Sequence, residues 1–195
     1  MDTPTNLEAP LRAIGDLLDR RGHAAAIVIV GGTALNLLGI VSRTTRDVDV
    51  IAVGNLTEGI PPSTLLPPDP LPEYLLELIA RVARDFGISD DWMNFVAGGQ
   101  WQTGLPPGFE ERVSWQRMGA LWIGLPGRID LISLKLYAAA DDIGPSSRHF
   151  TDLIALDPTS DELVAAADWI GTQDPSPDFS KVVAEVVHHV LEASH

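Results

Sequence analysis

Apolar residues recur every three to four positions along much of the chain, which predicts amphipathic helices. The stretches with this pattern are residues 6–22, 33–38, 71–86, 131–140, 147–156, 159–170 and 179–193. Glycine or proline stands at several of their borders, as at Gly22, Gly39 and Pro158. The last third of the chain is therefore predicted to be helical.

Short runs of β-branched and aliphatic residues predict strands in the first two thirds. Residues 26–30 (AIVIV) are typical of a buried strand, and glycines end this run. Residues 41–53 (VSRTTRDVDVIAV) alternate with a period of two, which predicts a strand with one polar face. Residues 113–116 and 120–123 predict a hairpin, whereas the six prolines of residues 58–72 predict a loop.

These elements predict an α+β fold, in which helices flank a small mixed β-sheet and a C-terminal helical region follows. The chain has 195 residues, of which 45% are hydrophobic, so it is long enough for one well-buried core. We expect one domain with a helical appendage, with the core in residues 1–127 and the helical region in residues 128–195. The absence of cysteine excludes disulfides, Cys-ligated zinc and thiol nucleophiles.

The net charge of the chain limits the partners that it is expected to bind. The chain carries 13 Lys+Arg against 27 Asp+Glu, a net charge of −14, and an acidic surface of this kind repels polyanions. A sequence-nonspecific nucleic-acid binder is expected to be basic instead. The N-terminal residues show no basic segment followed by an apolar run, and no apolar run approaches the ~20 residues of a membrane span. We therefore expect a cytoplasmic protein that does not enter a membrane.

Gly31-Gly32-Thr33 is the first candidate functional motif, because it joins a predicted strand to a predicted helix. Glycines let the backbone approach a ligand closely, and amides at the start of a helix suit a phosphate. A tight turn after a strand also requires glycine without any ligand. Both interpretations remain open for this turn.

Asp47-Val48-Asp49 is the second candidate. In a strand, residues two apart share a face, so the two carboxylates repel each other unless a cation lies between them. Two carboxylates suit Mg²⁺, which completes its shell with water and phosphate oxygens. By the same period Arg43 and Thr45 share this face, where Arg43 would hold phosphates or simply neutralise the aspartates. The alternative is a solvated strand face.

Lys135 and Asp152 form the third candidate. Lys135 is one of two lysines in the chain and lies in an apolar helix, where it would either reach a site or extend its ammonium to solvent. Asp152 would otherwise be an i,i+4 partner of Arg148. The adjacent His188 and His189 face different ways on a helix and do not suggest a metal site.

The segment GGTALNLLGIVSRTTRDVDV resembles the nucleotidyltransferase superfamily related to DNA polymerase β. More narrowly, the chain is similar to the AbiEii-like nucleotidyltransferases of bacterial type IV toxin–antitoxin systems, including the MenT-type toxins. The added similarity is LISLKLYAAADD followed by RHFTDLIALDPT. The resemblance spans residues 27–158, about two thirds of the chain.

The resemblance implies a nucleotidyltransferase fold and a Mg²⁺-dependent transfer of a nucleoside monophosphate from an NTP to an acceptor, with release of pyrophosphate. It implies that Asp47 and Asp49 bind Mg²⁺, that Lys135 stabilises the triphosphate or developing charge, and that Asp152 activates the acceptor as a base. The residues that it implies for nucleotide binding are Gly31, Gly32, Thr33, Arg43 and Thr45.

Many members of the superfamily carry a third metal carboxylate on a later strand. The candidates here are Glu110, Glu111 and Asp130, of which Asp130 is better explained as the N-cap of the helix at 131–140. Either the site has two protein carboxylates, or Asp152 completes it.

The toxin relatives imply tRNA 3′ ends as the acceptor and an antitoxin as a partner. A net charge of −14 is unfavourable for holding tRNA, although four arginines would assist if they converge: Arg20, Arg21, Arg81 and Arg84. The alternative acceptors are a small hydroxylated molecule or a protein hydroxyl. A relative that binds a nucleotide or a partner without catalysis is the remaining alternative.

Overall fold

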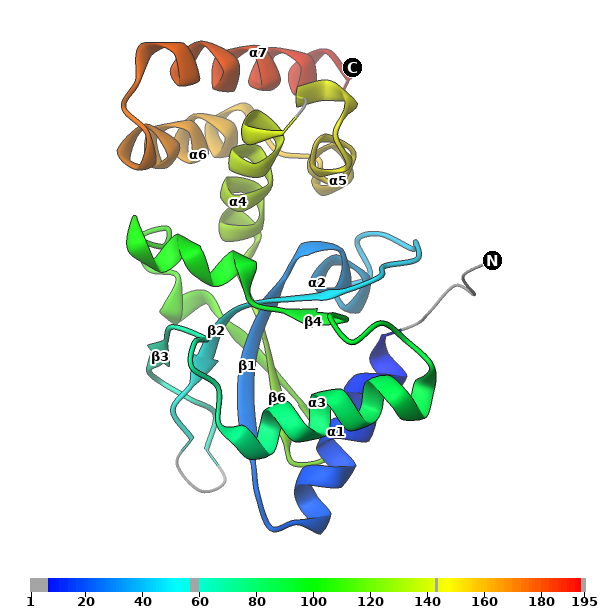
Figure 1. Ribbon diagram of the computed structural model, residues 1–195. Helices are drawn as coiled ribbons and strands as arrows, with labels where there is room; N and C mark the ends of the chain where they lie inside the picture. The colour runs from blue at the N-terminus through cyan, green and yellow to red at the C-terminus, as the bar shows by residue number, and fades with distance from the viewer. Residues whose placement is uncertain (1–6, 57–59, 143, 194–195) are drawn as a thin grey trace. The chain divides into compact units, whose positions relative to one another are not determined.

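The protein is described by a computed structural model that covers residues 7–56, 60–142 and 144–193 (Figure 1). It is an α+β protein with a mixed, open sheet, which confirms the predicted class. The chain divides into two compact units. The first contains Met1–Gln102 and Glu110–Pro126, and the second contains Thr103–Phe109 and Gly127–His195.

The first unit is built on the sheet. Its strands are β1 (Ala25–Val30), β2 (Val48–Gly54), β3 (Leu65–Leu66), β4 (Met93–Asn94), β5 (Ser114–Met118) and β6 (Leu121–Leu125). They lie in the order β3-β2-β1-β6-β5, and β4 pairs with β2 outside this path. Central β1 runs antiparallel to β2 and parallel to β6, and all six of its residues are buried. The hairpin predicted around Gly119 is present as β5 and β6.

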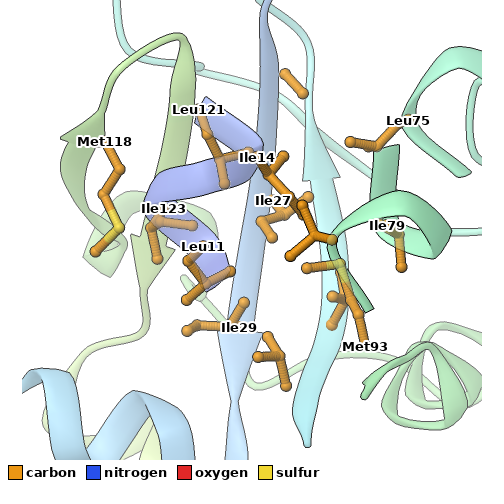
Figure 2. Close-up of a cluster of buried hydrophobic side chains, with 14 of the residues drawn as sticks. Leu11, Ile14, Ile27, Ile29, Leu75, Ile79, Met93, Met118, Leu121 and Ile123 are labelled. Carbon is orange, nitrogen blue, oxygen red and sulfur yellow. The ribbon is translucent and has the colours of Figure 1, made fainter. Parts of the chain in front are cut away.

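The helices of this unit are α1 (Glu8–Arg20), α2 (Gly31–Leu37) and α3 (Glu73–Phe86), and 3₁₀ turns cover Val96–Gln102 and Glu110–Arg112. The apolar stripes of α1 and α3 pack with the strands into one cluster, which Figure 2 shows. Labelled members are Leu11 and Ile14 of α1, Leu75 and Ile79 of α3, and Ile27, Ile29, Leu121 and Ile123 of the sheet. Burial of such side chains contributes about 1.5–3 kcal/mol each.

The second unit contains α4 (Arg128–Asp141), α5 (Arg148–Leu156), α6 (Ser160–Gln173) and α7 (Pro177–Ala193), with a 3₁₀ turn at Gly144–Ser146. α4 contacts each of the other three helices. Local signals set the helix starts: Ser147 caps α5 by accepting from the Phe150 amide, and Thr159 forms a capping box with Glu162 at α6. Pro177 is the first residue of α7, where its missing N–H costs nothing.

The predictions for two segments that adjoin β2 were wrong in part. The strand predicted over residues 41–53 begins only at Val48, because the Asn36 side chain forms hydrogen bonds with the backbone groups of Arg43 that strand pairing would use. The Asn36 amide donates to the Arg43 carbonyl at 2.7 Å, and the Asn36 side-chain oxygen accepts from the Arg43 N–H at 3.3 Å. The proline-rich loop contains the short strand β3, which pairs with the end of β2. Residues 58 and 59 of that loop lie outside the described residues.

Within the described part of the chain, no helix combines the length and the apolar character needed to cross a membrane.

Candidate functional site

The first glycine of the turn lies against an aspartate of the neighbouring strand. The β1–β2 register sets Val30 opposite Asp49, so Gly31 follows directly beside that carboxylate. A Cβ atom on Gly31 would lie 2.0 Å from Asp49 Oδ2, and the Gly31 φ of +72° is also unfavourable for other residues. Glycine is therefore required here both for backbone conformation and for the close approach of the carboxylate.

The second glycine lies beneath two polar side chains from the segment before β2. A Cβ atom on Gly32 would lie 2.6 Å from Thr45 Cγ2 and 2.7 Å from Arg43 Nη2. The turn is thus packed against the guanidinium group that the sequence suggested for phosphate binding. This contact brings Arg43 to the glycine turn even though Arg43 is not in a strand.

Thr33 and Thr45 join the same two segments through hydroxyl groups. Thr33 Oγ1 donates to the Asp47 carbonyl at 2.7 Å, and Thr45 Oγ1 lies 3.0 Å from Thr33 Oγ1. Because Thr33 has only one hydroxyl proton, Thr45 is the donor in the second contact. Both side chains are buried, so these hydroxyls bond to protein atoms and hold α2 against the start of β2.

The two aspartates differ in their surroundings. Asp47 is exposed just before β2, and Asp49 is half-buried within it. Asn94 Nδ2 of β4 donates to Asp49 Oδ1 at 2.9 Å. Sequence reasoning missed Asn94, because it lies in a segment whose pattern fits either a helix end or a strand. Its pairing with β2 is a contact between residues far apart in the chain.

The oxygen donors of Asp47 and Asp49 match the preference of Mg²⁺, which binds one or two carboxylates and keeps several waters. Among the described residues, no group of three or more His, Cys, Asp or Glu side chains is arranged for a metal ion. Glu110 and Glu111 are exposed in a 3₁₀ turn of the first unit. Asp130 belongs to the second unit and is fully buried.

Asp130 is not an N-cap, which corrects that prediction. α4 begins two residues earlier, at Arg128, and Gly127 is in the cap position. The helix starts there because contacts with the rest of the unit hold Arg128 in the first turn of α4. The Arg128 guanidinium donates to Glu162 Oε1 at 2.7 Å and to the Asp157 carbonyl at 2.8 Å.

Lys135 and Asp152 meet within the second unit. Lys135 Nζ of α4 donates to Asp152 Oδ2 of α5 at 2.7 Å, and the two side chains are 6% and 1% exposed. The ammonium therefore points inward, and the alternative in which Lys135 extends to solvent was wrong. A charged pair this deeply buried is held by its own attraction, because desolvation of either charge alone is very unfavourable.

Two of the four arginines considered for RNA pair with acidic side chains. Arg21 Nη1 lies 3.2 Å from Glu77 Oε2, and Arg81 Nε lies 3.4 Å from Asp85 Oδ2. Acidic side chains of α3 thus neutralise two of the four.

The C-terminal histidines also pair with acids of their own helix. His188 Nε2 lies 3.4 Å from Glu192 Oε1, and His189 Nε2 lies 3.9 Å from Glu185 Oε1. Such i,i+4 contacts on an exposed helix face need no metal to explain them.

Comparison with models of protein families, with curated proteins and with solved structures finds no significant match to this chain. The resemblance to nucleotidyltransferases therefore rests on the motifs in the sequence.

Proposed function

We propose that this protein is a Mg²⁺-dependent nucleotidyltransferase with a nucleotidyltransferase fold, which transfers a nucleoside monophosphate from an NTP to an acceptor and releases pyrophosphate. The observation that carries the proposal is the packing of Gly31 against Asp49, where a Cβ atom would lie 2.0 Å from the carboxylate oxygen. The glycine turn and Asp49, which are separated along the chain, thereby meet where β1 ends beside β2.

Asp47 and Asp49 would hold the Mg²⁺ ion, and when bound it would neutralise and orient the phosphates of the NTP. Asp47 is exposed and directly precedes β2. Asp49 Oδ1 accepts the Asn94 amide, and a carboxylate oxygen has a further lone pair for a ligand.

The backbone of Gly31 and Gly32 would approach the triphosphate, and the Arg43 guanidinium, which packs on Gly32, would bind it by its planar fork. The acceptor hydroxyl oxygen would then bond to the α-phosphorus and release its proton to water, as the bond from that phosphorus to pyrophosphate breaks. Positioning and charge neutralisation would supply most of the rate enhancement.

The resemblance to nucleotidyltransferases implies that Lys135 is a cation for the triphosphate or the developing charge. Its ammonium is fixed by Asp152 at 2.7 Å. Since the Asp152 carboxylate is 1% exposed and bonded to this ammonium, its burial favours a role in orienting Lys135 over direct activation of an acceptor.

We propose a tRNA 3′ end as the acceptor, with the protein acting in the cytoplasm as the toxin-like component of a toxin–antitoxin pair. A specific observation supports a second candidate. The net charge of −14, together with the pairing of Arg21 and Arg81 with acids, favours a hydroxyl on a small molecule or a protein.

The test is incubation of the purified protein with Mg²⁺ and each α-labelled NTP, together with total tRNA, a metabolite extract or no acceptor. Asp47→Ala and Asp49→Ala should abolish labelling, whereas Asp16→Ala, an exposed aspartate on α1, should retain it. Transfer retained in both site variants would overturn the proposed metal site. NTP binding without pyrophosphate release would instead indicate a non-catalytic relative.

Labelled tRNA would identify the first acceptor class, and a labelled small molecule or protein the second. Steep loss of activity with added salt is expected only for tRNA, because its binding releases condensed counterions.

A further inference from the structure

Asn94 lies beside Asp49 because β4 pairs in parallel with β2 (Figure 1). The register sets the two residues opposite each other, and Asn94 Nδ2 donates to Asp49 Oδ1 at 2.9 Å. The strand pairing begins one residue earlier in the chain, where the Val48 N–H donates to the Trp92 carbonyl at 2.6 Å. The backbone thus fixes the point from which the amide reaches the carboxylate.

A second contact fixes which end of the amide faces Asp49. Asn94 Oδ1 accepts from the Val96 N–H at 3.3 Å. Rotating the amide by half a turn would place its oxygen against a carboxylate oxygen and would lose both hydrogen bonds. The NH₂ group is therefore directed at the carboxylate by the local backbone.

The other oxygen of Asp49 is confined by the glycine turn. Oδ2 lies where a Cβ atom of Gly31 would be only 2.0 Å away. The carboxylate is thus held from one side by the Asn94 amide and fitted on the other side against a residue without a side chain. A ligand oriented in advance binds a cation more tightly, because little rotational freedom remains to be lost on binding.

We propose that Asn94 is a positioning residue, which holds the Asp49 carboxylate in the orientation that binds a divalent cation together with Asp47. The inference rests on the proposed function, which supplies the cation. Because Asn94 is neutral, the three side chains carry two negative charges, which one divalent cation balances. An aspartate in its place would add a third carboxylate and repel Asp49 in the absence of a cation.

The test uses Mn²⁺ as the probe, titrated into the full-length protein while free Mn²⁺ is followed by its electron paramagnetic resonance signal. Asn94→Ala should weaken Mn²⁺ binding about 10- to 100-fold, the usual effect of removing a residue that orients a metal ligand. Asn55→Ala, which alters an exposed asparagine after β2, should leave the affinity unchanged.

Asn94→Asp provides a second measurement by thermal melting. Without metal it should melt below the wild type, because two carboxylates then face each other across β2 and β4. Added Mn²⁺ should raise its melting temperature by more than it raises that of the wild type, since the cation relieves this repulsion.

The outcomes separate this inference from the proposed function. If Asn94→Ala melts at a lower temperature but binds Mn²⁺ as the wild type does, Asn94 only holds β4 and the inference is wrong. Mg²⁺-dependent transfer by the wild type would then still support the proposed function. A wild-type protein that binds no Mn²⁺ would overturn the Asn94 assignment together with the metal site.

Discussion

Lys135 Nζ donates a 2.7 Å hydrogen bond to Asp152 Oδ2, and this contact joins α4 to α5 in a buried environment. Burial of either charged group without the other would be very unfavourable, whereas in the pair each charge is compensated by its partner. The two residues therefore depend on each other for stability, whatever part they have in catalysis.

Lys135→Ala should lower the free energy of unfolding by about 3–5 kcal/mol, because it leaves a buried carboxylate without its ion-pair partner. Urea unfolding followed by far-ultraviolet circular dichroism, which reports the helices that make up this unit, measures the effect. Lys181→Ala is the matched control, because Lys181 pairs with Asp178 on the surface, where the two side chains are 76% and 95% exposed, and should contribute less than about 0.5 kcal/mol. Equal losses in the two variants would contradict the importance of the buried pair.

Gly31→Ala should destabilise the first unit and weaken Mn²⁺ binding. The added methyl would meet Asp49 Oδ2, and the φ of +72° adds about 1–2 kcal/mol of backbone strain. Gly39→Ala is a close control, since Gly39 has a φ of +71° but open space around its Cβ position. Gly39→Ala should therefore show the backbone strain alone. Similar losses of stability and of Mn²⁺ affinity in both variants would show that the contact with Asp49 is unimportant.

The periodic elements of this fold were predictable because their signals are local. The β-branched run became β1, and the apolar stripe before Phe86 became α3. The start of β2 was not predictable, because the contact between Asn36 and Arg43 that replaces strand pairing is tertiary. In the candidate site, the sequence suggested Gly31 and both aspartates by motif. Asn94 was missed, since only the β2–β4 pairing brings it to Asp49.

Gly15→Ala should be among the most destabilising glycine substitutions, although Gly15 is in the middle of a helix. A Cβ atom there would lie 1.7 Å from the Met118 carbonyl oxygen, and the Gly15 carbonyl accepts from the Ala120 N–H at 3.1 Å. The backbone of α1 thus packs directly on the β5–β6 turn, and a methyl group would separate them. We expect a loss of at least about 2–3 kcal/mol, by analogy with overpacked cores.

Gly171→Ala in α6 is the contrasting substitution, because nothing lies within 4 Å of its Cβ position. Removing glycine from a helix interior should stabilise the second unit by about 0.4–1 kcal/mol. Thermal melting and urea unfolding of both variants measure the contrast. Equal effects of the same sign would contradict the close approach of α1 to the hairpin.

The pair formed by Arg128 and Glu162 should make the second unit sensitive to acid. The hydrogen bond from Arg128 lowers the pKa of Glu162 below its ordinary value of 4.5, although partial burial opposes the shift. The folded state therefore holds the ionised carboxylate more strongly than the unfolded state does. The resulting stabilisation is fully present above pH 4.5 and is lost as the pH falls through the pKa of the folded state. Its size should be at most about 1 kcal/mol, because the Arg128 side chain is half exposed and screened by solvent.

Glu162→Gln tests this dependence, since glutamine keeps the capping contact to the Thr159 N–H but carries no charge. Urea unfolding followed by far-ultraviolet circular dichroism between pH 7 and pH 3 should show the variant less stable than the wild type near neutrality. The two curves should converge in acid, because protonation removes the same charge from the wild type. High salt should also reduce the difference at pH 7, since it screens a partly exposed pair. Curves that stay parallel over the whole pH range would show that the ion pair does not contribute and that Glu162 acts only as a cap.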